Sequence, residues 1–275
     1  MSATYAVLGC GWLGLPLAES LRKSGYSVRG SVRRQTALAD LEDVGVAPHL
    51  IHLHEDKVEG AISLFLEGVS RLYLTITPGL RKDPKRNFVA VIENLVPHIA
   101  KSQVKEVVFT SSTSVFGATQ GVVGHETFPL PDTESGRQLL AVEQLLLAQT
   151  SFTTQILRLG GLVDRNRHPA QTLARKEIIT EPQAPINLIH RTDAKGLLLH
   201  LPNQAPWNAT YNGVVPWHPS KKDFYDQAAK ELGLPPLRFS DTPGATNKKV
   251  VDLRIENELG YVFKEPRLGL TNWVG

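Results

Sequence analysis

The first constraint on the fold comes from a glycine pattern near the start of the chain, Gly9-x-Gly11-x-x-Gly14. The apolar residues 5–8 precede it and predict a buried strand, and the residues after Gly14 have the apolar spacing of a helix. Such glycines permit a tight turn, the approach of a pyrophosphate and close packing of the helix on the strand. An ordinary glycine turn is the alternative, but the strand–turn–helix context favours a dinucleotide site.

Length and charge exclude several classes of protein. A chain of 275 residues can bury one large core, or one core and a smaller lobe. A net charge of +3 is too small to favour nucleic acid or a membrane surface as a partner. No apolar stretch has the length of a membrane span, and we expect no signal peptide, so the expected location is the cytoplasm. The single cysteine, Cys10, excludes an internal disulfide and is interpreted as a small filler of the glycine segment rather than a nucleophile.

The end of the second expected strand, residues 26–32, bears on the choice of cofactor. It lies about 20 residues after the glycine pattern, where NAD-specific proteins carry an acidic residue for the ribose 2′-hydroxyl. Here the sequence has Ser31, Arg33 and Arg34 instead. Guanidinium groups bind phosphate through paired, charge-assisted hydrogen bonds, so NADP is predicted in preference to NAD. A solvated basic loop is the alternative.

Further apolar segments follow at the spacing of an α/β protein. Strands are expected over residues 49–53, 71–76 and 106–110. Asp83 and Pro84 predict the N-cap and first residue of a helix, and Pro97 predicts a kink or an end within it. The alternation predicts a Rossmann-like, doubly wound parallel sheet with its ligand at the carboxyl ends of the strands. His52 and the acidic residues near it lack a complete ligand set, so no metal site is predicted.

The strand and turn over residues 105–117 resemble extended short-chain dehydrogenase/reductases, the nucleotide-sugar epimerase/dehydratase group, in which a strand ends in a hydroxyl cluster before Val-Tyr-Gly. Similar stretches follow at residues 126–131, 156–158, 187–194, 211–212, 249–250 and 259–261. The resemblance implies an NADP-binding domain over residues 1–160 and a smaller C-terminal α/β lobe over 161–275. It also implies that a segment near residues 187–200 returns to the first domain, with the substrate in the crevice between the two.

The chain departs from this family at the catalytic pair. The family uses Tyr-x-x-x-Lys on the helix after the hydroxyl cluster. Counting from Glu143, which matches the helix glutamate of the family, the tyrosine position falls on Ser135 and the lysine position on Leu139. A serine hydroxyl is a far weaker acid than a phenol, and leucine carries no charge. The usual mechanism cannot operate, so the chain resembles an atypical branch of the family.

Three residues remain as candidates for catalysis. Ser112 aligns with the catalytic hydroxyl of the family and is expected beside the nicotinamide, with a serine that bonds backbone groups in the turn as the alternative. Ser135 begins the pattern Ser135-x-x-Gln138, which favours a capping box over proton transfer. Arg137 is a candidate for the missing positive charge or for binding an anionic substrate, with a solvated surface residue as the alternative.

The remaining candidates concern the cofactor, an acidic substrate and a second copy of the chain. The expected NADP contacts are Gly9, Gly11, Trp12, Leu13, Gly14, Ser31, Arg33, Arg34, Thr77, Pro78 and Ser111. The candidates for an acidic substrate, each with a structural role as the alternative, are Arg158, Arg167, His168 and His190. The leucine-rich helix over residues 136–149 is apolar on more than one face, which predicts burial on both sides. The resemblance implies that this helix forms a homodimer interface.

Two functions are consistent with these features. The first is an NADP-dependent oxidoreductase or epimerase-like enzyme that acts on a small hydroxyl, carbonyl or nucleotide-sugar substrate. The second is a non-catalytic NADP-binding protein that senses redox state or regulates a partner. The analogy of fold favours the enzyme.

Overall fold

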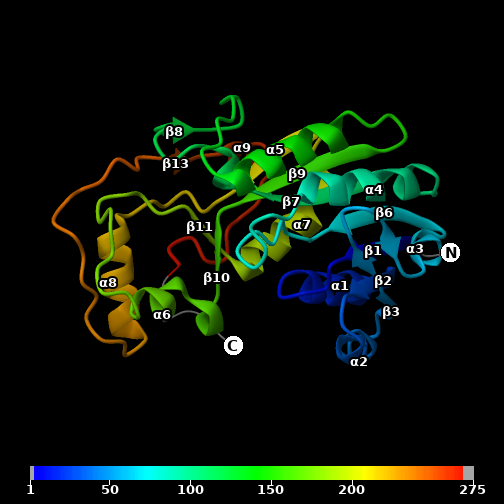
Figure 1. Ribbon diagram of the computed structural model, residues 1–275, viewed down its shortest axis with the longest axis horizontal. Coiled ribbons are helices and arrows are strands. Elements are labelled where there is room, and N and C mark those ends of the chain that lie inside the picture. Colours follow the sequence, from blue (N-terminus) through cyan, green and yellow to red (C-terminus); the bar gives the residue numbers. More distant parts are fainter. Residues whose placement is uncertain (1–2, 269–275) are drawn as a thin grey trace. The chain divides into compact units, whose positions relative to one another are not determined.

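The computed structural model describes residues 3–268, and its largest feature is a seven-stranded sheet (Figure 1). The strand order is β12-β9-β7-β6-β1-β2-β3, and β3, β2, β1, β6 and β7 pair in parallel. The strands are β1 (Thr4–Leu8), β2 (Ser27–Val32), β3 (Ala47–Leu50), β6 (Val69–Leu74), β7 (Glu106–Ser112), β9 (Thr153–Leu159) and β12 (Ala209–Gly213). Because the strand order reverses direction beside β1, the predicted doubly wound Rossmann-like fold is confirmed.

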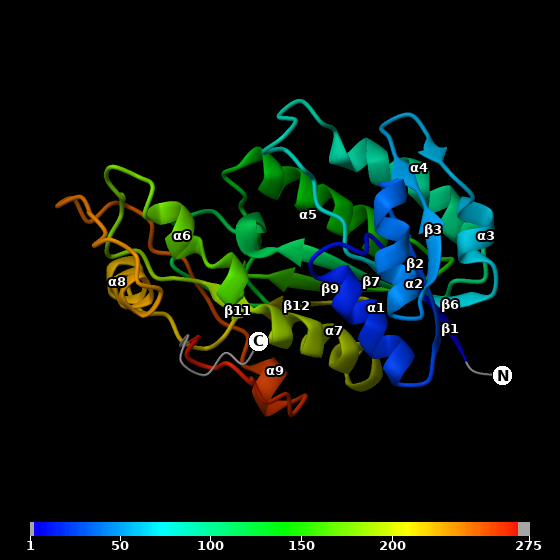
Figure 2. The same ribbon diagram turned by 90° about the horizontal axis from the view of Figure 1, so that it is seen from below.

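Helices cover both faces of this sheet (Figure 2). Helices α4 (Phe88–Ala100) and α5 (Glu134–Leu147) lie side by side on one face, and α1 (Gly14–Lys23) and α7 (Arg191–Gln204) lie on the other. The buried residues of α1 and α4 recur every three or four positions, so each helix presents one apolar stripe to the sheet. No helix among residues 3–268 is long and apolar enough to cross a membrane.

The chain forms two compact units, each assembled from separate stretches. The first unit contains the residues up to Ser112, Thr133–Arg158 and Leu198–Tyr211. It also holds α2 (Leu38–Asp43), α3 (Ile62–Leu66) and the antiparallel pair β4 (His52–Leu53) and β5 (Val58–Glu59). After Arg158, the stretch of the chain that enters this unit is Leu198–Tyr211.

The second unit contains Thr113–Asp132, Leu159–Leu197 and residues 212–268. Its short strands pair in parallel as β10 with β11 and β13 with β8. Its elements are β8 (Val122–Val123), β10 (Gly161–Val163), α6 (Pro169–Leu173), β11 (Leu188–His190), α8 (Lys221–Glu231), β13 (Lys249–Val250) and α9 (Arg254–Asn257).

Two predicted elements were wrong in detail. The expected strand over residues 49–53 is interrupted at Ile51, so β3 belongs to the large sheet while β4 pairs with β5. The helix expected at Asp83 begins at Phe88 instead, because Asn87 accepts the Ala90 N–H and forms the N-cap. Asp83 accepts the amide of Lys85 within a turn. Helix α4 also continues through Pro97 to its last turn.

Candidate functional site

The glycine loop between β1 and α1 is held by hydroxyl groups from neighbouring strands. Gly9 has φ +102°, and a Cβ there would lie 2.7 Å from Ile76 Cγ2. The Gly9 N–H donates to Ser31 Oγ at 3.1 Å, and its carbonyl accepts from the Gly11 N–H at 2.7 Å and from Thr75 Oγ1 at 2.8 Å. The loop therefore has one fixed backbone path between β2 and β6.

The fold does not require glycine equally at the three positions. A Cβ at Gly14 would collide with the Gly9 carbonyl oxygen and would lie 2.6 Å from Thr75 Oγ1. A Cβ at Gly11 would meet no heavy atom nearer than 4.0 Å. The fold therefore requires glycine at positions 9 and 14, whereas position 11 opens onto free space.

The end of β2 presents two cations beside this loop. Arg33 and Arg34 directly follow the strand and are exposed, and neither guanidinium has a hydrogen-bond or ion-pair partner within residues 3–268. Ser31 is buried, and both of its oxygens bind the glycine loop. Its hydroxyl accepts the Gly9 N–H, and its carbonyl accepts the Cys10 N–H at 2.8 Å. Ser31 thus shapes the loop, while the two arginines remain available to a ligand.

The other expected cofactor residues lie near the carboxyl ends of the central strands. Leu13 is buried and Trp12 half-buried at the start of α1, and Thr77 is exposed and Pro78 buried in the loop after β6. Sequence reasoning missed Thr75, whose hydroxyl binds the glycine loop. The signal available for Thr75 was its place directly after an apolar strand.

Cys10 is inert, as its interpretation as a filler requires. Its thiol is buried and lies 3.4 Å from the Val7 carbonyl. Burial raises the pKa of this thiol to about 12, so the nucleophilic thiolate does not form near neutral pH.

Ser111, Glu143 and Arg158 form a buried polar cluster. The Ser111 hydroxyl donates to Glu143 Oε1 at 2.5 Å, and Arg158 Nη2 donates to Glu143 Oε2 at 2.6 Å. This ion pair ties α5 to β9 and to the end of β7. Arg158 therefore has a structural role, which was the alternative to binding an acidic substrate. The hydroxyl of Ser111 already donates its proton to the Glu143 carboxylate. Ser112, the last residue of β7, is half-buried.

Helix α5 begins earlier than its capping pattern predicted. Thr133 is the N-cap, because its side chain accepts the Gly136 N–H at 3.1 Å. The predicted cap at Ser135 was wrong, and Ser135 is instead half-buried within the first turn. Gln138, the expected partner in that capping box, accepts the Phe88 N–H at 2.7 Å and fastens α5 to the start of α4.

Residues 135 and 139, where the resemblance predicts the tyrosine and the lysine, differ in their surroundings. Leu139 is 3% exposed and belongs to the apolar core. Arg137 forms an exposed pair with Glu134 at 3.0 Å, with both side chains 54% exposed, as its surface alternative predicted. One side of α5 is buried within the chain, whereas Leu140 and Leu147 are half-buried.

The six tyrosines all lie among residues 3–268, and none directly follows the carboxyl end of a strand in the large sheet. Tyr73 is buried inside β6 and Tyr225 inside α8, and burial raises the pKa of each phenol to about 12. Burial also raises the pKa of Tyr261, which donates to Asp193 Oδ1 at 3.0 Å.

The histidines proposed for an acidic substrate serve the backbone of the second unit. His168 is the N-cap of α6 and accepts the Ala170 N–H at 3.2 Å, and burial lowers its pKa to about 4. The His190 Nδ1 accepts the Thr192 N–H at 3.3 Å, and burial lowers the pKa of this imidazole too. A neutral imidazole supplies no positive charge to an anion near pH 7. Arg167 lies exposed in the short turn before His168.

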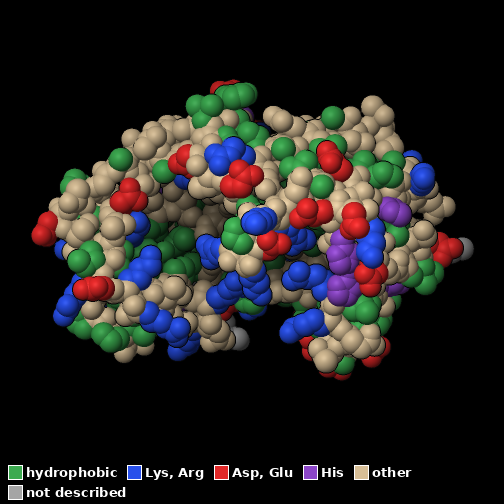
Figure 3. Space-filling model, viewed as in Figure 1, with side chains coloured by type: hydrophobic (Ala, Val, Ile, Leu, Met, Phe, Trp, Pro, Cys, Tyr) green, Lys and Arg blue, Asp and Glu red, His purple; other side chains and the backbone are tan. Residues whose placement is uncertain are grey.

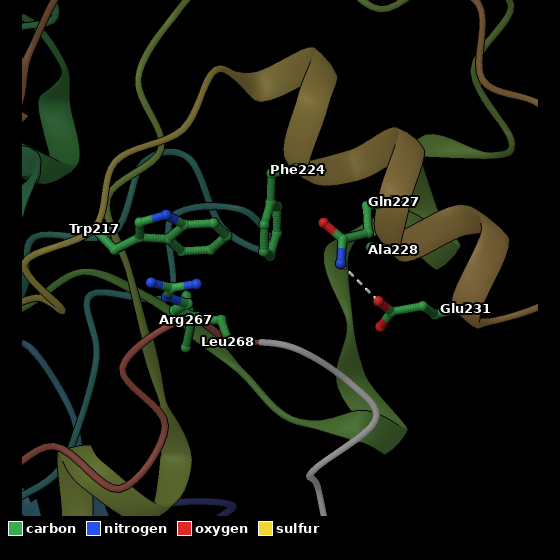
Figure 4. A pocket seen from close by; sticks show the side chains of 7 residues that line it. All are labelled: Trp217, Phe224, Gln227, Ala228, Glu231, Arg267 and Leu268. Atoms are coloured by element: carbon green, nitrogen blue, oxygen red, sulfur yellow. Dashed lines mark hydrogen bonds between the residues drawn. The ribbon is translucent and has the colours of Figure 1, made fainter.

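Two cavities are lined by residues other than those of the glycine loop. The first, in the second unit, holds about 10 Å³, which is room for no more than one water molecule. Figure 4 shows its lining residues, Trp217, Phe224, Gln227, Ala228, Glu231, Arg267 and Leu268. The second, of about 510 Å³, lies between the ends of α3 and α4 at the amino edge of the large sheet. Neither cavity adjoins a residue proposed for catalysis.

Histidine side chains gather on one part of the surface drawn in Figure 3. The rings of His52 and His54 stack with their centroids 6.2 Å apart, and His54 Nε2 lies 3.2 Å from a Glu59 carboxylate oxygen. Within the described part of the chain, no three His, Cys, Asp or Glu side chains are placed to hold a metal ion.

Comparisons with known proteins connect this geometry to relatives. No protein-family model matches the chain. Protein YeeZ of Escherichia coli (strain K12) is 35% identical over 266 residues, which cover 95% of this chain and 96% of that protein. A functionally unknown conserved protein from Silicibacter pomeroyi DSS has a solved structure with TM-score 0.78 and 25% identity, covering 98% of this chain and 97% of that one. UDP-glucuronic acid 4-epimerase from Bacillus cereus, in complex with NAD, has the same fold, with TM-score 0.77, 16% identity and coverage of 95% and 94%.

Proposed function

This chain belongs to the same family as the Escherichia coli protein YeeZ, and from that premise we propose that it is an NADP-dependent oxidoreductase or epimerase-like enzyme. Its substrate is a small hydroxyl or carbonyl compound or a nucleotide sugar. The Bacillus cereus neighbour, an epimerase with NAD bound, supports a nicotinamide dinucleotide on this fold. Bound NADP would supply the hydride chemistry, and the chain binds and orients the reactants.

The observation that carries this proposal is the glycine loop. Gly9 and Gly14 are needed by the fold, but the space beside Gly11 has no structural use within the described chain. A pyrophosphate fits against residue 11, where the backbone is open and the start of α1 offers N–H groups to an anion.

Arg33 and Arg34 support NADP over NAD. They follow β2 directly, at the place where the family distinguishes the two cofactors, and no described side chain neutralises them. A 2′-phosphate would provide the paired oxygens that guanidinium groups bind best.

The test is a titration of the protein with NADPH, NADP and NAD, repeated on an Arg33→Ala/Arg34→Ala variant. NADPH binding should weaken about 100-fold in the variant, as expected for the loss of two charge-assisted contacts. NAD binding should change less than about threefold, because NAD lacks the 2′-phosphate.

The matched control is Lys101→Ala/Lys105→Ala. It removes two exposed charges from the same unit near the amino edge of the sheet. It should leave the affinity for NADPH unchanged. If no dinucleotide binds the unaltered protein, the enzyme proposal is withdrawn and the glycine loop is an inherited scaffold.

Ser112 is the residue proposed to meet the substrate. It ends β7, at the edge of the sheet where the nicotinamide is expected. Hydride transfer depends mainly on the alignment of cofactor and substrate. Since no tyrosine is placed for the proton, we propose that water or another side chain near Ser112 delivers it. Ser135 does not cap α5, so we propose its hydroxyl as a second candidate to deliver this proton.

The second candidate function is a non-catalytic NADP-binding protein. It is favoured by the burial of Leu139 in the core and by the absence of a tyrosine from the carboxyl ends of the strands. The variant Ser112→Ala separates the two functions. It should abolish turnover on a carbonyl and sugar-nucleotide panel if the protein is an enzyme. A regulatory protein shows no turnover on that panel, and its affinity for NADP stays intact in the variant.

We also propose a homodimer through α5 and a cytoplasmic location. Leu140 and Leu147 are half-buried and two turns apart, so they lie on one side of the helix. Sedimentation velocity should give a dimer for the unaltered chain and a monomer for Leu140→Lys/Leu147→Lys. A monomer in both cases removes the dimer and leaves the cofactor proposal standing.

A further inference from the structure

Lys248 binds the turn into which the chain passes directly after Ser112. Its Nζ donates to the carbonyl oxygens of Thr113 at 3.1 Å and Phe116 at 2.8 Å. The Thr113 carbonyl also accepts the Phe116 N–H at 3.2 Å. A side chain from residue 248 therefore closes both ends of a turn more than 130 positions earlier in the sequence.

The backbone on either side of Lys248 is fixed as well. Asn187 donates to the Lys248 carbonyl at 2.8 Å and accepts the Val250 N–H at 2.7 Å. The Lys249 N–H donates to the Gly121 carbonyl at 2.9 Å, where β13 pairs with β8. These bonds all lie within the second unit, so its residues 113–123 and 247–251 form one hydrogen-bonded piece.

Burial of this ammonium needs an explanation. Desolvation lowers the pKa of Lys248, with Asp132 acting in the opposite direction. A lysine that served only solubility would extend into water, as its neighbour Lys249 does. The cost of partly burying the charge is offset by the two carbonyls, which fixes the geometry of the turn.

We propose that Lys248 is a positioning residue for Ser112, holding the turn after β7 so that the Ser112 hydroxyl keeps one place in the site. This inference rests on the proposed function, because the place of Ser112 matters only if a ligand meets it. In this proposal, Lys248 holds the part of the site that contains the Ser112 hydroxyl. Residue 139, where the resemblance predicts a lysine, is a leucine and cannot contribute a charge.

The first measurement is amide hydrogen exchange, followed by mass spectrometry, on Lys248→Met, Lys248→Arg and Lys249→Met. In Lys248→Met, exchange at the Phe116 and Gly121 amides should become about tenfold faster or more, with β6 unchanged. Lys248→Arg should restore much of the protection. Lys249→Met, which changes the exposed next residue at the start of β13, should match the unaltered protein.

The second measurement tests whether Lys248 acts through Ser112. The fluorescence emission of bound NADPH should change in Lys248→Met and in Ser112→Ala, with the dissociation constant within about threefold of the unaltered value. In the double variant Lys248→Met/Ser112→Ala, the two changes in NADPH emission should not add. Once the Ser112 hydroxyl has been removed, moving the turn that positions it has no further effect.

The outcomes separate the two proposals. If the unaltered protein binds no NADPH, the proposed function fails, and the role of Lys248 toward Ser112 fails with it. If NADPH binds but exchange and emission in Lys248→Met stay unchanged, or if the emission changes add, only the Lys248 inference is overturned. Should Lys248→Met not fold, Asn187→Ala frees the strand while keeping the ammonium, and the same exchange increase at Phe116 is expected.

Discussion

Two glycines of the loop make opposite predictions at the scale of single residues. Gly11→Ala should leave the free energy of unfolding within about 0.5 kcal/mol, because its Cβ would enter open space. NADPH binding should nevertheless fall at least about tenfold, since that space is proposed to take the pyrophosphate. Isothermal titration with NADPH and urea unfolding would measure both effects on the same preparation.

Gly14→Ala provides the contrast. Its Cβ would collide with the Gly9 carbonyl and crowd Thr75, so the unliganded protein should lose about 1–3 kcal/mol of stability. If Gly11→Ala binds NADPH normally, the pyrophosphate does not lie against residue 11.

The spacing of the glycines and of Arg33 and Arg34 could be predicted from sequence, because a fingerprint of this kind is local in the chain. The bracing of the loop by Ser31 and Thr75 could not, since these hydroxyls lie 22 and 66 residues from Gly9. Contacts of that range depend on which strands become neighbours, and no local pattern records them.

The start of α5 shows why one element was predicted two residues late. Thr133 and Ser135 are both good N-cap residues, and Gln138 completes a capping box only for the second. In the structure Gln138 binds α4 instead, so the local signature yields to a tertiary contact.

This assignment predicts unequal effects of two similar substitutions. Thr133→Ala should cost about 1 kcal/mol of unfolding free energy, because the Gly136 amide loses its acceptor. Ser135→Ala should cost less than about 0.5 kcal/mol, since it caps nothing. Urea denaturation followed by circular dichroism would rank the two, and equal losses would contradict the assigned helix start.

At the scale of the whole molecule, stability should fall in mildly acidic solution. Burial lowers the pKa of folded His168 to about 4, whereas an unfolded histidine titrates near 6.5. Between these values the unfolded chain binds more protons, so stability is fully present above pH 6.5 and is lost as the pH falls toward 4. The contribution lost between pH 7 and 5 is about 2 kcal/mol.

His168→Asn isolates this contribution. Asparagine is also a good N-cap and can accept the Ala170 amide without titrating. Urea unfolding at pH 7 and pH 5 should therefore show a smaller loss in the variant than in the unaltered protein. His190 and His218, whose pKa values burial also lowers, remain in both proteins and cancel in the comparison. Equal losses would show that His168 is accessible to protons when folded.

The architecture as a whole was the part most open to prediction. Alternating strands and helices specify a parallel sheet almost uniquely, because the crossovers leave few alternatives. The residues expected for catalysis were harder to place, since Ser135 and Arg137 acquire their surroundings only when α5 packs.

The interleaving of the two units has a consequence for biosynthesis. Each unit is completed by a stretch from late in the chain, Leu198–Tyr211 for the first and residues 212–268 for the second. A ribosome therefore releases most of the polypeptide before even the first unit has all of its parts, so the usual N-terminal-first order of domain folding is closed to this chain.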